Sequence, residues 1–326
     1  MTYSRIFHQV LALGLMALLA SPGAMAQNYP NKPIKFIVPF PAGSATDNVG
    51  RILAQAMGEA LGQSITIENK AGANGILGAE AVKASPADGY TFLVTTSTTQ
   101  AANVHLYRKL SYDPVKDFTP IGKIGETGFI LMVNTDFPAK DMKEFIAYAK
   151  QRPGALNSAS AGIGAVNHLG TEYFNLLTGT KLVHVPYRGG GPALRAVIGN
   201  EAQISFTSLV PTLPHVKSGR LRALGITTPK RSALLPDVPS VSETVPGFDI
   251  THWYGMWGPK GMPRNVVALW NKEIGSLVNT PEMQRRLRVE GLEPAGGPPS
   301  QMYNIVKRDV NKWRSVMKKA GIQQAR

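Results

Sequence analysis

Two loops of similar composition place small residues, glycines and hydroxyl groups directly before a stretch with helical spacing. The first loop runs from Pro39 to Asp47 and the second from Ser160 to His168. A helix begins with backbone N–H groups that lack partners and with the positive end of its dipole, and glycine lets a ligand approach that backbone closely. Two such loops facing each other would clamp a small anion. Taken singly, each loop also has the composition of an ordinary turn, and that interpretation stays open.

Residues for other kinds of chemistry are poorly represented. The chain has no cysteine, which excludes disulfides, thiolate metal ligands and cysteine nucleophiles. It contains no G-x-S-x-G elbow, no phosphate-binding loop and no complete G-x-G-x-x-G. The six histidines lack the spacing of a metal site. We therefore expect neither catalysis nor a metal or cofactor, and an exported α/β hydrolase or lyase is kept as a remote alternative.

The elements that would position these loops alternate between strands and helices. The apolar run 34–38 predicts a buried strand, and Ser44 and Asp47 have the spacing of a capping box. Apolar residues then recur at helical spacing from Val49 to Ala60. Further strands are predicted at 64–68, 90–95, 127–134, 157–161, 181–185, 203–206, 221–227 and 253–258, and further helices at 76–84, 97–107, 141–150, 167–177, 192–198, 209–217, 264–278, 281–290 and beyond 300. This alternation indicates an α/β fold with mostly parallel sheets flanked by helices.

The N-terminus has the pattern of a secretory signal peptide. Arg5 precedes an apolar stretch at 10–20, and Ala24-Met25-Ala26 offers small residues for cleavage before Gln27. Without a cysteine for lipid attachment, we expect the mature protein to be free in the periplasm. The formal net charge of +14 favours anionic partners. Because the basic residues form no stripe interleaved with aromatic residues, nucleic acid is not an expected partner.

A series of short motifs, taken in order, resembles one family of receptors. The motifs are Asn31-Lys32-Pro33-Ile34, Pro39-Phe40-Pro41-Ala42-Gly43 with Asp47, Glu68 to Gly75, Ala87 to Thr91, Tyr112 to Phe118, Ser160 to Gly164 with His168-Leu169, His184 to Ala193, Gly219 to Leu224, Leu235 to Ser240 and Trp253-Tyr254-Gly255. Together they resemble the Bug or TctC-like periplasmic solute receptors of tripartite tricarboxylate transporters. The resemblance spans nearly the whole mature chain.

This resemblance implies a type II periplasmic binding protein with two lobes and a ligand cleft between them. The implied segments are a signal peptide at 1–26, the first part of lobe 1 at 27–127, lobe 2 at 128–249 and the second part of lobe 1 at 250–326. Crossings between the lobes are expected near 125–129 and 248–251. Such a receptor encloses a small organic acid by hinge closure and hands it to the permease subunits of its transporter. We expect a monomer.

The resemblance also implies which residues contact the ligand. In lobe 1 they are Phe40, Pro41, Ala42, Gly43, Ser44, Thr96 and Ser97, with Asp47 bracing the loop. In lobe 2 they are Ser160, Ala161, Gly162, Gly164, Asn167 and His168, with Tyr187 as a side wall. Ser205 stands where the family often has an acidic residue that could hold an amino group, which argues against amino-acid ligands.

Two questions stay open at this point. Phe40 and Tyr187 would suit an aromatic carboxylate, whereas the polar loops would suit an aliphatic di- or tricarboxylic acid. A subunit that presents its ligand to a signalling receptor would use the same closed cleft, so it remains the alternative to a transport receptor.

Overall fold

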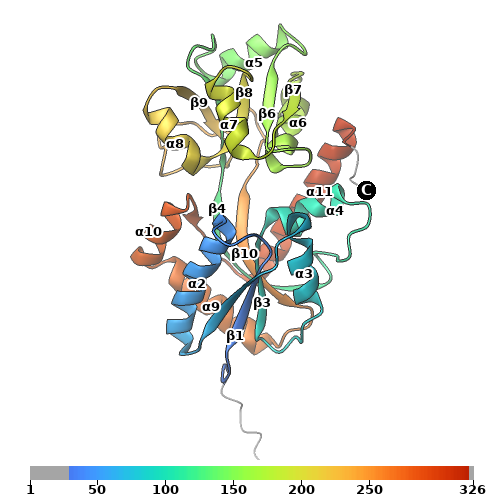
Figure 1. The fold of residues 1–326 in the computed structure, drawn as a ribbon, viewed down its shortest axis with the longest axis vertical. Helices are drawn as coiled ribbons and strands as arrows, with labels where there is room; N and C mark the ends of the chain where they lie inside the picture. Colours follow the sequence, from blue (N-terminus) through green and yellow to red (C-terminus); the bar gives the residue numbers. More distant parts are fainter. Residues whose placement is uncertain (1–28, 323–326) are drawn as a thin grey trace, which may run out of the picture.

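The first of two sheets forms the lobe at the bottom of Figure 1. The computed structural model describes residues 29–322. The strands of this sheet lie in the order β11 (Glu293–Pro294), β4 (Phe118–Thr127), β10 (His252–Pro259), β3 (Thr91–Thr96), β1 (Ile34–Val38) and β2 (Ile65–Asn69). Its helices are α2 (Ala45–Leu61), α3 (Ile76–Lys83), α4 (Asn103–Leu106), α9 (Arg264–Val278) and α10 (Pro281–Val289), with short turns η1 (Ala73–Gly75) and η2 (Thr98–Ala102).

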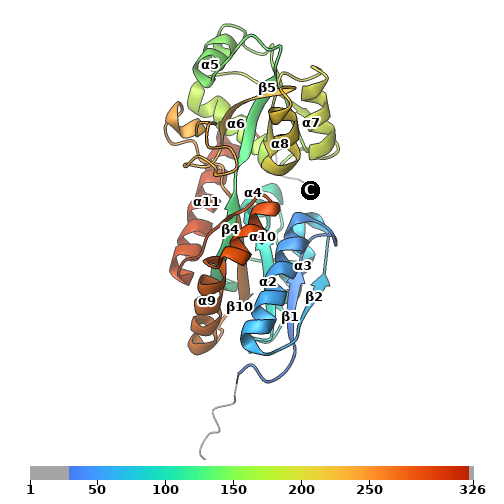
Figure 2. The ribbon, with the colours of Figure 1, turned by 90° about the vertical axis from the view of Figure 1, so that its left-hand side faces the viewer.

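The second sheet forms the upper lobe. Its order is β7 (Val183–Pro186), β6 (Asn157–Ser160), β8 (Ile204–Ser208), β5 (Phe129–Asn134) and β9 (Leu221–Ile226). Its helices are α5 (Met142–Lys150), α6 (Val166–Thr178), α7 (Gly190–Ile198) and α8 (Leu209–Lys217), followed by the turn η3 (Val241–Glu243). The predicted α/β fold with two lobes is confirmed (Figure 2).

Both sheets are mixed, which refines the expectation of mostly parallel strands. In the first sheet β1 runs parallel to β2 and β3, and in the second β6 runs parallel to β7 and β8. The antiparallel pairs are β10 with β3 and β4, β11 with β4, and β5 with β8 and β9. The pairs of β5 and β10 are antiparallel because these two strands have just crossed from the other lobe, so each enters its sheet from the cleft side.

The chain crosses between the lobes at two places. β4 ends at Thr127 and β5 begins at Phe129, so the first crossing turns at Gly128. On the return, Ile250 still donates its N–H to Thr227 of the upper lobe at 3.0 Å, and β10 begins at His252. The resemblance implied crossings near 125–129 and 248–251, and the lobe boundaries drawn from them remain a prediction.

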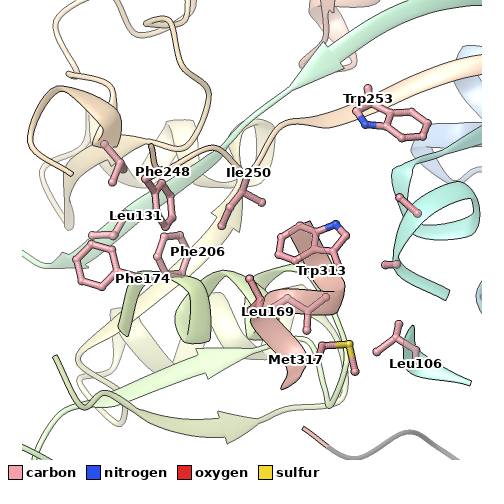
Figure 3. Close-up of a cluster of buried hydrophobic side chains, with 14 of the residues drawn as sticks. Leu106, Leu131, Leu169, Phe174, Phe206, Phe248, Ile250, Trp253, Trp313 and Met317 are labelled. Carbon is pink, nitrogen blue, oxygen red and sulfur yellow. The ribbon is translucent and has the colours of Figure 1, made fainter. Parts of the chain in front are cut away.

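A helix at the C-terminus joins the two lobes a third time. α11 (Pro299–Ala320) packs against β4 and α4 in the lower lobe and against α6 in the upper lobe. In Figure 3, Trp313 and Met317 of α11 lie beside Leu169 of α6, and Ile250 of the return crossing lies close to Trp313. One hydrophobic core therefore runs through both lobes behind the crossings, whereas the outer face of each sheet has a core of its own. The lobe boundaries remain a prediction, since α11 has contacts on both sides.

Besides the two-residue strand β11, which was not predicted, two elements differ from the sequence prediction. β4 was not expected, because Pro120, Gly122 and Gly125 interrupt any apolar periodicity; the strand forms through its long pairing with β10. The helix predicted at 97–107 is instead the π-helical turn η2 followed by the short α4.

The predicted signal peptide at 1–26 lies outside the described residues. Within residues 29–322, no helix is both long enough and apolar enough to cross a membrane.

Candidate carboxylate-binding site

A cavity of about 320 Å³ lies between the lobes, beside both crossings. Its lining residues are Thr98, Phe129, Ala161, Ala165, Val166, Asn167, Gly190, Gly191, Leu194, Thr207, Ser208, Pro211 and His252. None of these thirteen residues is a lysine, arginine, aspartate or glutamate. The cavity therefore has no fully charged side chain in its wall.

Three helices of the upper lobe begin at this cavity. Their N-cap residues are Ala165 for α6, Gly189 for α7 and Ser208 for α8, and none of them makes a side-chain capping hydrogen bond. Residues of all three starts line the cavity. At α6 the N–H of His168 is accepted by Asn167 Oδ1 at 3.1 Å. The other N–H groups of these three starts and the positive ends of three helix dipoles converge on one space, which favours a bound anion.

Side chains of α6 brace the loop at 160–168. Asn167 Oδ1 accepts from the N–H of Ala161 at 3.2 Å, and His168 Nδ1 accepts from the N–H of Gly164 at 3.0 Å. Gly162 and Gly164 have φ of 132° and 79°, a region that side chains disfavour. These hydrogen bonds fix the shape of the loop, of which Ala161, Ala165, Val166 and Asn167 line the cavity.

Two histidine rings stack beneath this loop. His168 and His184 have centroids 3.7 Å apart and planes inclined by 18°. Burial, and then the charge of His184, lowers the pKa of His168 to about 4, and burial also lowers the pKa of His184. Both rings are therefore neutral at pH 7. Ser160 Oγ hydrogen-bonds His184 Nε2, but among the described residues no carboxylate hydrogen-bonds the other nitrogen of this ring, as a catalytic triad requires.

The corresponding loop of the lower lobe is held by Asp47. This side chain is 1% exposed and accepts hydrogen bonds from Gly43 N–H at 2.8 Å, Arg51 Nε at 2.9 Å and Asn69 Nδ2 at 2.9 Å. Burial raises the pKa of Asp47, but the three donors outweigh burial and hold it below its ordinary value. Asp47 thus reaches back beyond Ser44, the N-cap residue of α2, to the glycine before it.

The remaining predicted residues are not in the cavity wall. Ser97 Oγ hydrogen-bonds His252 Nδ1 at 2.7 Å, and the buried Thr96 Oγ1 has no partner within residues 29–322. Tyr187 is half-buried and donates its N–H to Ser160 O at 2.9 Å. Ser205 is fully buried and donates to Ala159 O at 2.8 Å.

Of the sixteen residues predicted from sequence, two line the cavity, Ala161 and Asn167. The other residues of the cavity wall come from the loop at 160–168, the starts of α7 and α8, the end of β8, the turn after β3, and the two crossings. Outside the loop at 160–168, a local signal existed for α7, in the glycine run Gly189-Gly190-Gly191 before Pro192. Phe129 and His252 carry no local signal, because they meet only through the fold.

Within residues 29–322, no three histidine, aspartate or glutamate side chains lie close enough together to hold a metal ion.

Comparison with known proteins identifies the family. The model of the "Tripartite tricarboxylate transporter family receptor" matches residues 49–322. The chain is 32% identical to protein BugT of Bordetella pertussis, over 93% of each chain. Its structure is similar to Rpa4515 of R. palustris with adipate (TM-score 0.76, 34% identity, covering 91% of this chain and 100% of that one). It is also similar to MatC of Rhodopseudomonas palustris with bound malate (TM-score 0.70, 32% identity, 88% and 99%). The chain belongs to the family of TctC and Bug solute-binding receptors.

Proposed function

We propose that this receptor binds a small organic carboxylate in the cavity between its lobes and has no catalytic activity. The observation that carries the proposal is the convergence of three uncapped helix starts on a cavity without charged side chains. A carboxylate would accept hydrogen bonds from these N–H groups, whereas an ammonium group would meet the positive ends of the dipoles. Two relatives whose structures hold adipate and malate support the same ligand class.

The lower lobe would contribute by closing over this cavity. The loop at 40–44 is exposed at Pro41, Ala42 and Gly43 and lies outside the cavity wall. Rotation about Gly128 and the 250–251 segment would bring this loop toward the bound anion, with Asp47 keeping it in shape. Thr96, Ser97 and Tyr187 would then lie at the edges of the closed site. We propose that the closed form delivers the acid to the permease subunits of a tripartite tricarboxylate transporter, working in the periplasm as a monomer.

A thermal-shift screen of the chain from Gln27 onward tests this proposal. The panel contains aliphatic carboxylates, aromatic carboxylates, amino acids and sugars, with adipate and malate among the first group. A ligand at 100 times its Kd stabilises the folded state by about 2.7 kcal/mol. We expect a clear rise in melting temperature with at least one carboxylate and none with sugars. A response to sugars or cationic solutes alone would contradict the proposal, as would release of a chemically altered acid. Small-angle scattering at saturation should show a more compact particle.

A further inference from the structure

His252 occupies the place where the return crossing enters the lower lobe. It is the first residue of β10 and lines the cavity. Its ring lies 6.1 Å from that of Phe129, the first residue after the other crossing, and stands edge-on to Tyr254 at 5.2 Å. The two crossings therefore each place one ring in the cavity wall.

One hydrogen bond determines which ring nitrogen of His252 carries the proton. Ser97 Oγ lies 2.7 Å from Nδ1, and the Ser97 hydroxyl has no other acceptor within residues 29–322. Donation of this hydroxyl to Nδ1 gives its proton an acceptor and places the proton of the neutral ring on Nε2, whereas the other tautomer leaves the hydroxyl proton without an acceptor among the described residues. Burial lowers the pKa of His252 to about 4, so the ring is neutral at pH 7.

The protonated nitrogen is available to a ligand. Nε2 has no hydrogen-bond partner within residues 29–322, and it is not among the fully buried polar atoms that lack one. Nε2 is therefore not fully buried, and His252 is one of the residues that line the cavity. An N–H group left without an acceptor in a dry, closed cleft would be costly, so a ligand that fills the closed cleft must supply one.

We propose that His252 is a specificity-determining residue whose Nε2–H donates a hydrogen bond to an acceptor oxygen of the bound acid, and that Ser97 is the positioning residue that keeps this donor on Nε2. This inference rests on the proposed function. It adds a requirement that the helix starts do not impose. The ligand must present an acceptor at the hinge end of the cleft, and analogues carrying a methyl or an ammonium group there would be rejected.

Two substitutions of His252 distinguish the contribution of its hydrogen-bond donor from the contribution of its ring. Glutamine places its amide nitrogen near the position of Nε2, whereas asparagine places its amide near Nδ1 and leaves the cavity side empty. Affinity would be measured by calorimetry, with adipate and malate as probes. We expect His252→Asn to weaken binding by about ten-fold or more, as for loss of a hydrogen bond to a charged group. His252→Gln should retain most of the affinity, and Ser97→Ala should cause a smaller loss than His252→Asn. The same pair of substitutions at His215, on α8 and outside the cavity wall, is the control.

Wild-type affinity in His252→Asn would overturn the inference. Equal losses in the asparagine and glutamine variants, with unchanged melting temperatures, would also overturn it, because the ring and not its donor would then matter. If either variant fails to fold, nitrogen NMR of histidine-labelled wild-type protein decides instead. We expect a protonated Nε2 on His252 whose resonance shifts when adipate or malate binds, and a protonated Nδ1 would refute the assignment. Failure of the wild type to bind any carboxylate would refute the proposed function itself, which is a different result.

Discussion

Replacing Asp47 by asparagine removes a buried charge that holds the first-lobe loop. The two oxygens of Asp47 accept three hydrogen bonds, two of them at Oδ2 from Gly43 N–H and Arg51 Nε. An asparagine has one acceptor oxygen, so its amide group must face at least one of these donors. The hydrogen bond from Gly43 to a charged group contributes about 1.5–3 kcal/mol. The Arg51 side chain is 53% exposed, so water can replace its partner and the loss there is below about 1 kcal/mol.

We therefore expect Asp47→Asn to lower the free energy of unfolding at pH 7 by about 2–4 kcal/mol. Urea unfolding followed by tryptophan fluorescence measures this quantity. Glu59→Gln is the matched control, because Glu59 is an exposed carboxylate on the same helix that accepts a hydrogen bond from Gln55, and it should change stability by less than about 0.5 kcal/mol.

The pH dependence of this difference gives a second check. The pKa of Asp47 is lower in the folded state than in the unfolded chain, so its contribution is complete above the unfolded pKa and is lost as the pH falls through the folded value. The gap between wild type and Asp47→Asn should therefore narrow below about pH 4. If Asp47→Asn matches the Glu59→Gln control at pH 7, the reasoning that this carboxylate holds the loop is refuted.

Three further predictions concern the core shared by both lobes, the stacked histidines and the buried Ser205 of β8. Trp313→Ala should cost about 3–5 kcal/mol in urea unfolding because this side chain, 3% exposed, packs in the core shared by both lobes; Tyr303→Ala, 40% exposed on the same helix, should cost far less, and equal effects would contradict the role of α11. The pKa of His168 is lower in the folded state than in the unfolded chain, where it is near 6.5, so the unfolded chain takes up the proton first as the pH falls. The free energy of unfolding should therefore decrease between pH 6.5 and pH 4, by up to about 1.4 kcal/mol per pH unit. Urea unfolding at pH 7 and pH 5 measures this decrease, which should be smaller in His184→Gln than in the wild type. An equal decrease in both proteins would show that the stacked histidines do not cause it. Ser205→Asp should lower the melting temperature and weaken carboxylate binding measured by calorimetry, since it buries an unpaired negative charge; unchanged affinity would remove Ser205 from the site.

Local patterns predicted the elements that bury one face of a helix or a short apolar strand. Val49, Leu53 and Met57 of α2 recur at helical spacing and are all buried. In contrast, β4 could not be predicted because Gly122 and Pro120 break its pattern, and its stability comes from pairing with residues more than 120 positions later. Pairing over such distances leaves no trace in a short window of sequence.

Some residues of the candidate site could likewise be predicted from sequence, and others could not. The loop at 160–168 could be found because glycines and a helix start adjoin in sequence. His252 and Phe129 could not, since each is an unremarkable strand residue until the two crossings bring them together. The direction of the strands was also hidden, because it depends on which strands have crossed from the other lobe.

The central claim is that uncapped helix starts hold an anion in a cavity without charged side chains. Calorimetry on the chain from Gln27 onward, comparing adipate with its diamide and malate with its diamide, tests it most directly. The pairs share shape and differ in charge. We predict that at least one acid binds and that its diamide binds at least about ten-fold more weakly, because hydrogen bonds and dipoles act more strongly on a charged acceptor. Equal affinities for an acid and its diamide would contradict the account.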